Sequence, residues 1–488
     1  MSASFASILL LWPGLAWADP EGDWALAATR RALVAAEAPM TLGGADRSPL
    51  ALGLAAEGLT GARLDPFVAL TAPTLPGERG FVVTAGGFVR IAVGDGRTQG
   101  LLGDAEPGLL SPRLGVSALA VSPWWEVKAQ AQGWLDVGGG EGVTASAPLM
   151  AAWAGLRRGP ARVGFGIEPR ALGPGRHSAL LLGDDARPFP AGSAAVEGEV
   201  GRLGVARAEL AMGWLQRPRR DVNRPGIIVM DARWRPKPWV ELGASRVGQF
   251  AGEARPWPGL GELLLPLDPH IYGDPDQLEA DSNELASIDV QLIAPLGWAH
   301  PQAETLAVYW QYGGDDLIVD DSGAVPIPRL AGVANLFGAE LSAGPLVLNV
   351  EYARLMDDYF RWYTGHRVYH EGFTQDGRSL GHVNGGDSLT WWGRVGWVTP
   401  AWGVTLMTEQ VRRVEVVEVL QDQVFTAMTE ERRRRYGLTL MVADPNKGRL
   451  ELELTTERLL GGDFVPGADE RLTRAAVTWT APLWRPTP

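Results

Sequence analysis

Apolar and polar residues alternate along most of the chain from about residue 80 onward. Near the C-terminal end, Leu450, Leu452 and Leu454 alternate with Glu451 and Glu453. A period of two places successive side chains on opposite faces of a β-strand. Each such segment is therefore predicted to be a strand with one apolar and one polar face. The same period recurs at residues 125–132, 163–167, 288–292, 306–312, 346–352 and 389–397.

Turn-forming residues separate these alternating segments. A cluster of Asp, Pro, Asn, Lys and Gly at residues 444–448 lies between the segments at 438–442 and 450–454. Such clusters favour turns, so this pair is predicted to form an antiparallel hairpin. At roughly 22 residues for a strand and its share of loop, residues 80–484 hold about 18 strands. The last strand is expected at about 471–483.

Two all-β architectures produce this alternation: a soluble sandwich, whose apolar faces meet in a core, and a transmembrane barrel, whose apolar face meets lipid. The segments are close in length to the ~9–11 residues of a strand that crosses a bilayer at a tilt. Charged residues recur on the face opposite the apolar one. Tryptophans stand near predicted strand ends, as in the aromatic belts of membrane barrels. We therefore predict a transmembrane antiparallel β-barrel of about 18 strands. These tryptophans are Trp134, Trp239, Trp298, Trp397, Trp402, Trp479 and Trp484.

The N-terminal part of the chain has a different pattern. A short apolar stretch ends in a small-x-small sequence at residues 16–18, which predicts a secretory signal peptide over residues 1–18. Pro13 disfavours the alternative, a buried N-terminal helix. Residues 19–79 are predicted to be a small helical region in the periplasm, followed by the barrel over residues 80–488. The chain is expected to be exported to the outer membrane of a Gram-negative bacterium.

Composition narrows the function classes. The 488 residues carry 44 Lys and Arg against 57 Asp and Glu, a net charge of −13, which argues against a nucleic-acid partner. There is no cysteine, which excludes disulfides, thiolate metal sites and cysteine nucleophiles. With only six histidines, we expect neither a metal site nor another cofactor. The sequence contains no recognisable nucleophile–base arrangement or paired carboxylates, so it is not expected to encode an enzyme.

Residues 172–190, the first loop segment, carry candidate chemistry. They follow the strand predicted at 163–167 and combine glycine and proline turns with a leucine run and Arg187. One interpretation is a constriction loop that folds into the barrel and plugs it. The other is a loop that contacts sugar, with the guanidinium of Arg187 directed into the lumen.

Residues 359–388, the second loop segment, concentrate aromatic side chains and three of the six histidines. Aromatic rings stack on the apolar face of a pyranose, while His, Arg and Asp side chains hydrogen-bond its hydroxyl groups. The alternative is an ordinary loop that its histidines brace. A metal site is disfavoured because Gly365 argues against the helix that would align His366 with His370. The candidate polysaccharide-binding residues of both segments are Arg187, Tyr369, His370, Arg378, His382 and Asp387.

Two strongly charged segments have simpler interpretations. Five acidic residues between 274 and 284 lack the EF-hand pattern, so a solvated loop is preferred over a Ca²⁺ site. Four arginines at 432–435 follow Glu430 and Glu431. They are able to attract an acidic polymer, but we expect a strand end at the barrel rim whose charges pair with each other.

With both loop segments in view, the chain resembles the capsule assembly protein Wzi family. The resemblance implies an outer-membrane barrel of about eighteen strands, a small periplasmic helical part and a lumen closed by loops. It also implies a role in attaching exported polysaccharide to the cell surface. The residues that carry it are Gly173-Pro174-Gly175, Leu180–Leu182 and Ala186-Arg187-Pro188, then Tyr369-His370, Gly372-Phe373, Arg378, Gly381-His382 and Asp387.

The chain departs from the family pattern at two places. Ala171-Leu172 stands where the family usually has tryptophan before Gly-Pro-Gly, and Asp184-Asp185 stands where it often has two asparagines. These departures remove amide donors and add negative charge. They point to a neutral glycan, or one that differs from the family's usual acidic polymer.

The expected function is an outer-membrane barrel that binds capsular or exported polysaccharide and helps attach or assemble it on the cell surface. Its expected partners are that polysaccharide and outer-membrane lipid, with the polysaccharide export machinery as a further candidate. The alternative is a porin or channel for small solutes or for polysaccharide export, because charged lumen residues fit it equally well. An enzyme built on His370, Glu371, His382 and Asp387 ranks last.

Overall fold

The structure is a computed structural model of the chain. The expected signal peptide at 1–18 and helical region at 19–79 lie outside the described residues. Among the residues that the structure describes, no helix is long and apolar enough to cross a membrane. The described residues are 82–94, 109–122, 124–137, 143–146, 149–183, 186–216, 218–259, 263, 282–296, 303–314, 316–320, 327–356, 362–363, 366, 368–399, 401–420, 423–444 and 448–484.

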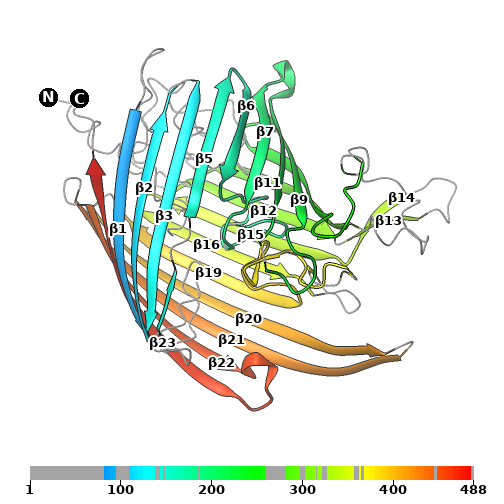
Figure 1. Cartoon of the computed structure of the whole chain (residues 1–488). Helices are drawn as coiled ribbons and strands as arrows, with labels where there is room; N and C mark the ends of the chain where they lie inside the picture. The colour runs from blue at the N-terminus through cyan, green and yellow to red at the C-terminus, as the bar shows by residue number, and fades with distance from the viewer. Residues whose placement is uncertain are drawn as a thin grey trace.

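One antiparallel sheet closes on itself to form a barrel (Figure 1). It closes because β1 (Val82–Gly94) pairs with both β2 (Leu110–Val121) and β23 (Asp469–Trp484). The sheet has 19 strands, but β4 (Val143–Ser146) and β5 (Leu149–Arg158) both pair with β3 (Trp125–Val137) and share one position. The barrel therefore has 18 strand positions, and both the all-β class and the predicted number are confirmed.

The remaining strands follow in chain order around the wall. In Figure 1, β20 and β21 extend well beyond their neighbours. The bounds are β6 (Ala161–Ile167), β7 (Pro190–Glu199), β8 (Val205–Trp214), β9 (Gly226–Lys237), β10 (Val240–Phe250), β11 (Asn283–Pro295), β12 (Ala303–Gly314), β15 (Ala334–Ala343), β16 (Leu346–Arg354), β19 (Ser388–Val398), β20 (Trp402–Leu420), β21 (Gln423–Asp444) and β22 (Gly448–Leu460). Two hairpins lie outside this sheet, β13 (Asp316–Asp320) with β14 (Ile327–Ala331), and β17 (Thr374–Gln375) with β18 (Arg378–Ser379).

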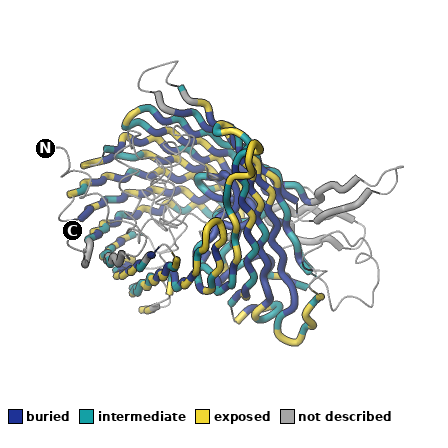
Figure 2. Tube along the Cα trace, turned by 90° about the horizontal axis from the view of Figure 1, so that it is seen from above, coloured by how far each residue is buried: buried dark blue, intermediate teal, exposed yellow. Residues whose placement is uncertain are grey.

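The period of two in the sequence becomes an outward apolar face and an inward polar face. On β22, Leu450 and Leu454 are 50% and 42% exposed on the outside, whereas Glu451 and Glu453 are both 5% exposed and face inward. Figure 2 shows this alternation as short bands of different burial along each strand. A soluble protein would bury its leucines instead, so the pattern is that of a barrel in lipid.

Tryptophans mark the end of the barrel where the connections are short. Trp239, Trp397, Trp402 and Trp479 are exposed on the outer face there, as expected for an aromatic belt. Trp134 does not belong to the belt: it faces inward, and the guanidinium of Arg113 lies 5.5 Å from its ring centroid. Trp298 and the side chain of Trp484 lie outside the described residues.

The two ends of the barrel differ in the length of their connections. At one end, two residues join β5 to β6 and two residues join β15 to β16. We call this the short-turn end. At the other, the long-loop end, residues 168–189, 215–225 and 355–387 join neighbouring strands. Outer-membrane barrels have short periplasmic turns and longer extracellular loops, which assigns the long-loop end to the cell exterior.

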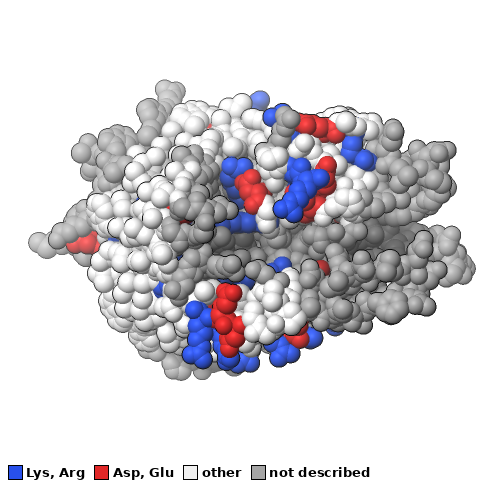
Figure 3. Space-filling model, turned by 60° about the horizontal axis from the view of Figure 1, so that its bottom comes forward, with Lys and Arg blue, Asp and Glu red and all other residues white. Residues whose placement is uncertain are grey.

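Acidic and basic side chains pair across the inner wall. Arg90 and Glu453 lie 2.8 Å apart, and Arg233 and Asp289 lie 2.7 Å apart. In Figure 3 the charged side chains of the visible face also gather in mixed groups rather than in areas of one sign. Pairing lowers the cost of holding these charges away from bulk water.

The main hydrophobic core lies inside the barrel. Leucines of the first loop segment pack against Phe373 and Leu380 of the second, and against wall residues such as Ile227, Val229 and Leu336. All of these side chains are almost fully buried. We call the two loop segments together the plug, since they occupy the lumen at this level.

Candidate functional site

The first loop segment is anchored to the wall by Gln311 of β12. Gln311 accepts a hydrogen bond from the Leu180 amide at 3.2 Å and donates one to the Leu172 carbonyl at 3.2 Å. The segment also closes on itself, because the Leu172 amide donates to the Leu182 carbonyl at 2.8 Å. Gly173 has a φ of +111°, and a Cβ there would lie 2.6 Å from the Gln311 amide group. Only glycine fits this approach to the wall.

The second loop segment is bonded directly to the first, although they lie about 200 residues apart in sequence. The Gly183 amide donates to the Leu380 carbonyl at 2.6 Å, and the Val383 amide donates to the Ser178 hydroxyl at 3.0 Å. The first segment therefore folds into the lumen, as one of the two sequence interpretations predicts, and contact of this segment with sugar stays a prediction.

Tyr363 completes the joint between the two segments. Its hydroxyl donates to the Leu180 carbonyl and accepts from the His382 amide at 2.8 Å. Gly381 lies beside this hydroxyl, and a Cβ at this position would be 2.2 Å from it. Glycine is thus required for the close approach of the two segments.

A third loop, residues 215–225 between β8 and β9, clamps the second segment and was not anticipated from the sequence. Arg219 donates to the carbonyls of Thr374 and Gly372 at 2.8 and 2.9 Å and to the Asp221 carboxylate at 2.9 Å. Asp221 accepts in turn from the Glu371 amide at 2.8 Å. Burial would raise the pKa of Asp221, but the hydrogen bonds from Arg219 and from backbone amides outweigh it and lower the pKa.

A buried polar cluster fastens the plug to strands β19–β21. The Nε2 of His177 lies 2.9 Å from Oε1 of Glu409, and the His177 ring stacks on Trp392 with centroids 4.8 Å apart. The Asn384 amide donates to the same Glu409 oxygen at 2.8 Å. Burial first, and then the proximity of His177, lower the pKa of His382 to about 3, with Glu409 opposing them. His382 is therefore neutral at physiological pH.

Three of the six predicted site residues lie at the accessible surface of the plug. Nε of Arg187 is 2.7 Å from Oδ2 of Asp376, and the two side chains are 40% and 43% exposed. Asp376 lies in the turn between β17 and β18, next to Arg378, which is partly exposed. His370 is exposed as well. The structure thus brings arginines from both loop segments to one exposed hairpin. We call this hairpin, Arg187 and the exposed His370 that precedes the hairpin in the chain the plug surface.

The other three predicted residues are buried or make contacts within the fold. Tyr369 is fully buried, and its hydroxyl donates to the Ala251 carbonyl at 2.9 Å. His382 is 1% exposed. Asp387 has a φ of +53° and turns the chain into β19, with its amide donating to the Leu355 carbonyl at 3.0 Å. Tyr369 and His382 are thus too buried to line the plug surface, whereas Asp387 is half-buried.

The charged segments noted in the sequence differ in outcome. Arg432–Arg435 lie within β21 rather than at its end, so that part of the expectation is wrong. Three of the four, Arg432, Arg433 and Arg435, pair with acidic neighbours as expected, whereas no such pair is seen for Arg434 among the described residues. Glu284 pairs with Arg246, and the acidic residues at 274–281 lie outside the described residues. Nowhere in the described part of the chain do three or more His, Asp or Glu side chains gather as metal ligands.

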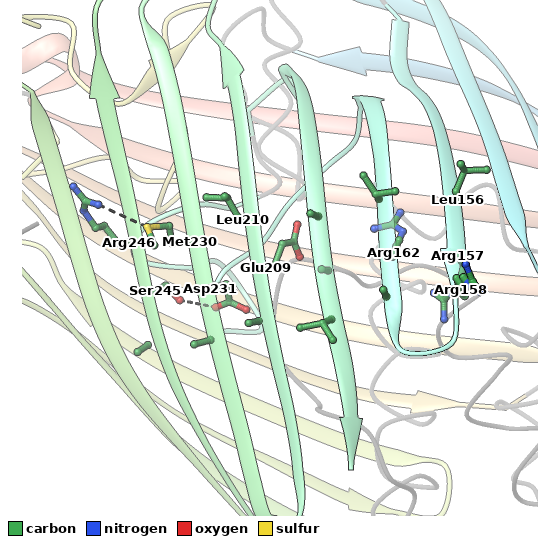
Figure 4. Close-up of a pocket in the computed structure, with 18 of the residues that line it drawn as sticks. Leu156, Arg157, Arg158, Arg162, Glu209, Leu210, Met230, Asp231, Ser245 and Arg246 are labelled. Atoms are coloured by element: carbon green, nitrogen blue, oxygen red, sulfur yellow. Dashed lines mark hydrogen bonds between the residues drawn. The ribbon is translucent and has the colours of Figure 1, made fainter. Parts of the chain in front are cut away.

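A groove of about 1180 Å³ lies on the barrel wall and runs across the strands from β5 to β11 (Figure 4). The sheet register gives Leu210 and Met230 the same outward face as Val163, which is 54% exposed. Alanines of β7–β11 form its floor: Ala194, Ala208, Ala232, Ala244 and Ala286. Because these residues belong to the lipid-facing surface, the groove is separate from the plug surface.

The fold and the site define a class: an outer-membrane β-barrel whose own loops fold into the lumen and pack there. The family model for the capsule assembly protein Wzi matches residues 103–483. The chain therefore belongs to the Wzi family of capsule assembly proteins.

Comparison with solved structures agrees with this family. Wzi of Escherichia coli, described as a carbohydrate-binding β-barrel involved in group 1 capsule assembly, matches with a TM-score of 0.66 and 19% identity over 94% of this chain and 97% of that one. OccK5 (OpdH) of Pseudomonas aeruginosa matches with a TM-score of 0.47 and 12% identity over 83% of this chain and 98% of that one. The second score is too low to carry a conclusion. A search of the curated proteins finds no match.

Proposed function

We propose that the chain binds capsular or exported polysaccharide at the plug surface and helps attach it to the cell. The observation that carries the proposal is the exposed pair of Arg187 and Asp376 beside Arg378, on loops that three sets of buried contacts hold rigid. Preorganised polar groups of this kind bind sugar hydroxyls without a large ordering cost. Many weak contacts along one polymer then give strong attachment. Membership in a capsule assembly family supports this function.

Within the plug surface, we assign direct contact to Arg187, His370 and Arg378. Tyr369, His382 and Asp387 act by positioning the loops. Binding of this type requires no catalysis, and we propose that the chain is not an enzyme. The net charge of −13 argues for a weakly charged glycan, since a strongly acidic one would be repelled.

Conduction of solutes is supported less well. The leucines of the first loop segment and Tyr363 of the second are buried in the lumen and bonded to the wall or to each other. An open pore would place water-accessible polar groups there instead. We further propose export through an N-terminal signal peptide, a Gram-negative outer membrane and contact with the polysaccharide export machinery.

The test is the ratio of cell-bound to released polysaccharide in a deletion strain that carries either the wild-type gene or a variant. We expect wild type to restore retention and Arg187→Gln/Arg378→Gln to leave polymer in the medium. The control is Arg158→Gln/Arg202→Gln, which removes two exposed arginines at the short-turn end and should restore retention. If retention is unchanged by deletion while small-solute uptake falls, the chain is a porin and the attachment function is wrong.

A further inference from the structure

The outer face of β20–β23 changes from apolar to basic in regular rows. Paired residues on neighbouring strands form each row, and every second residue faces outward. The row at the short-turn end is Trp402, Val442, Leu450 and Trp479. Two further apolar rows and one of Thr408, Tyr436, Thr456 and Thr473 follow it. The next row is Gln410, Arg434, Arg458 and Arg471, and the one after it contains Arg412, Arg432, Leu460 and Asp469.

The first basic row lies where the membrane ends. Each strand runs from the tryptophan row to this row in eight residues, for example from Trp402 to Gln410. At ~3.3 Å per residue and a strand tilt of roughly 40°, this distance corresponds to about 20 Å of membrane thickness. The apolar band of such barrels is about 25 Å tall. The arginines of β21–β23 therefore lie at the edge of the apolar band on the side of the long-loop end, where their long side chains reach the lipid headgroups.

The charges of this surface are only partly balanced by protein. Arg412 and Arg432 share Glu430, at 2.8 and 2.5 Å. Arg458 is 2.8 Å from Asp469. Within the described residues, no ion pair is seen for Arg434 or Arg471, although Asp469 attracts Arg471 electrostatically, and both arginine side chains are exposed. We call Arg412, Arg432, Arg434, Arg458 and Arg471 the outer arginine cluster.

Three arginines of the cluster lie side by side in one row. Arg434 is directly opposite Arg458, which is directly opposite Arg471. Like charges directly opposite each other on a sheet destabilise it. A phosphate relieves this repulsion, because planar guanidinium groups bind phosphate through two parallel hydrogen bonds. The cluster also faces away from the barrel axis, toward the surrounding leaflet rather than toward the plug surface.

We propose that the outer arginine cluster binds the phosphate groups of a lipid in the leaflet around the long-loop end. The site is independent of polysaccharide binding. The lipid fixes the barrel in the outer leaflet and neutralises Arg434 and Arg471. Anionic lipid attracts basic residues near the membrane surface by about 1 kcal/mol for each cation.

The experiment compares binding of lipid A, which carries phosphates, with binding of dephosphorylated lipid A. The detergent-solubilised full-length barrel is analysed by native mass spectrometry. We expect wild type to prefer lipid A, and Arg434→Gln/Arg471→Gln to bind it about 30-fold more weakly. Arg434→Lys/Arg471→Lys should lose less, because the charge remains and only the bidentate geometry is lost. The matched control is again Arg158→Gln/Arg202→Gln, which should bind as wild type does.

Three results would overturn the proposal: unchanged lipid A affinity of the glutamine variant, equal binding of both lipids by wild type, or an equal loss in the control. A fourth is binding of soluble heparin, but not lipid A, through the same arginines, which would make the cluster a polysaccharide site. Both glutamine positions are exposed, and the heat-dependent shift of the folded barrel on a gel verifies that each variant folds. If the glutamine variant does not fold, the lysine variant and the phosphate comparison on wild type still decide the outcome.

Discussion

The Nε2 of His177 lies 2.9 Å from the Oε1 of Glu409, and this contact joins the first loop segment to strand β20 of the wall. Arg435 of β21 holds the other oxygen of the same carboxylate at 3.1 Å. The plug is therefore tied to the wall through a buried charged group as well as through apolar packing. A hydrogen bond to a charged group contributes about 1.5–3 kcal/mol.

Replacing His177 with alanine is expected to loosen the plug without unfolding the barrel. The variant loses both the bond to Glu409 and the stacking on Trp392. In planar bilayers we expect brief channel openings that wild type lacks, together with faster proteolysis of residues 172–190. His370→Ala is the control, since His370 is exposed on the plug surface. Equal conductance of His177→Ala and wild type would show that the contact does not hold the plug closed.

The second prediction concerns acid. His382 has a pKa of about 3 when folded, against an ordinary value of 6.5. As the pH falls from about 6.5 toward 3, a protonated His382 is favoured only in the opened loop, so the loop becomes less stable. Amide hydrogen exchange of residues 380–385, corrected for its intrinsic pH dependence, should therefore increase below pH 6.5. His382→Gln should abolish this part of the pH dependence, and an unchanged profile would contradict the assignment.

The pKa of Asp221 is lowered in the folded protein, as that of His382 is, but its effect on stability falls in a different pH range. Its contribution to stability is complete above its ordinary pKa of 3.8 and is lost as the pH falls through the folded value. Loosening between pH 6.5 and 4.5 can thus be assigned to His382 rather than to Asp221. The two residues lie in different loops, so hydrogen exchange separates them.

The sequence is informative where the side-chain period is strong. Alternation around Leu450 and Glu451 predicts the barrel, because a wall between lipid and lumen imposes a strict period of two. The turn at 444–448 also places β21 and β22 correctly. The last strand, expected at about 471–483, is Asp469–Trp484. Counting by twos from Val127 would also have placed Trp134 on the inner face.

The plug is less predictable, because its backbone has no period. Tyr369 and His382 are residue types that contact sugars, yet the loop path buries them. Arg219 binds carbonyls more than 150 residues away, and no local pattern marks such a contact. The family resemblance implies a lumen closed by loops, but the direct bonding of the two loop segments was not predicted.

Close packing at Gly381 gives a third prediction. An alanine Cβ there would lie 2.2 Å from the Tyr363 hydroxyl and 2.5 Å from the Leu180 carbonyl, so the two loop segments must separate. Overpacking of this kind typically costs about 1–3 kcal/mol. Gly381→Ala should increase hydrogen exchange at residues 178–183 and lower polysaccharide retention. Gly393→Ala is the control, because its Cβ would meet only ordinary contacts at 3.8 Å or more; similar effects from both variants would refute the packing explanation.

The fourth prediction concerns Arg219. A variant of this residue tests whether it contacts glycan itself or only positions the residues that do. It is buried, and it fixes the β17–β18 hairpin through the Gly372 and Thr374 carbonyls. Arg219→Gln should weaken polysaccharide retention although Arg187 and Arg378 remain, because the hairpin loses its clamp. Asp221 also loses its buried partner, which should destabilise the folded loop by about 3 kcal/mol or more.

The neighbouring Arg220 is the matched control, since its side chain is exposed and its described bond is made by the backbone amide. Arg220→Gln should retain polymer as wild type does. Hydrogen exchange across residues 371–380 should rise for Arg219→Gln alone. If retention falls while exchange stays at the wild-type level, Arg219 contacts the glycan itself, and the clamp assigned to it is wrong. If both stay at the wild-type level, the hairpin is held by its remaining contacts, such as Gln216 to Gln375 at 3.0 Å.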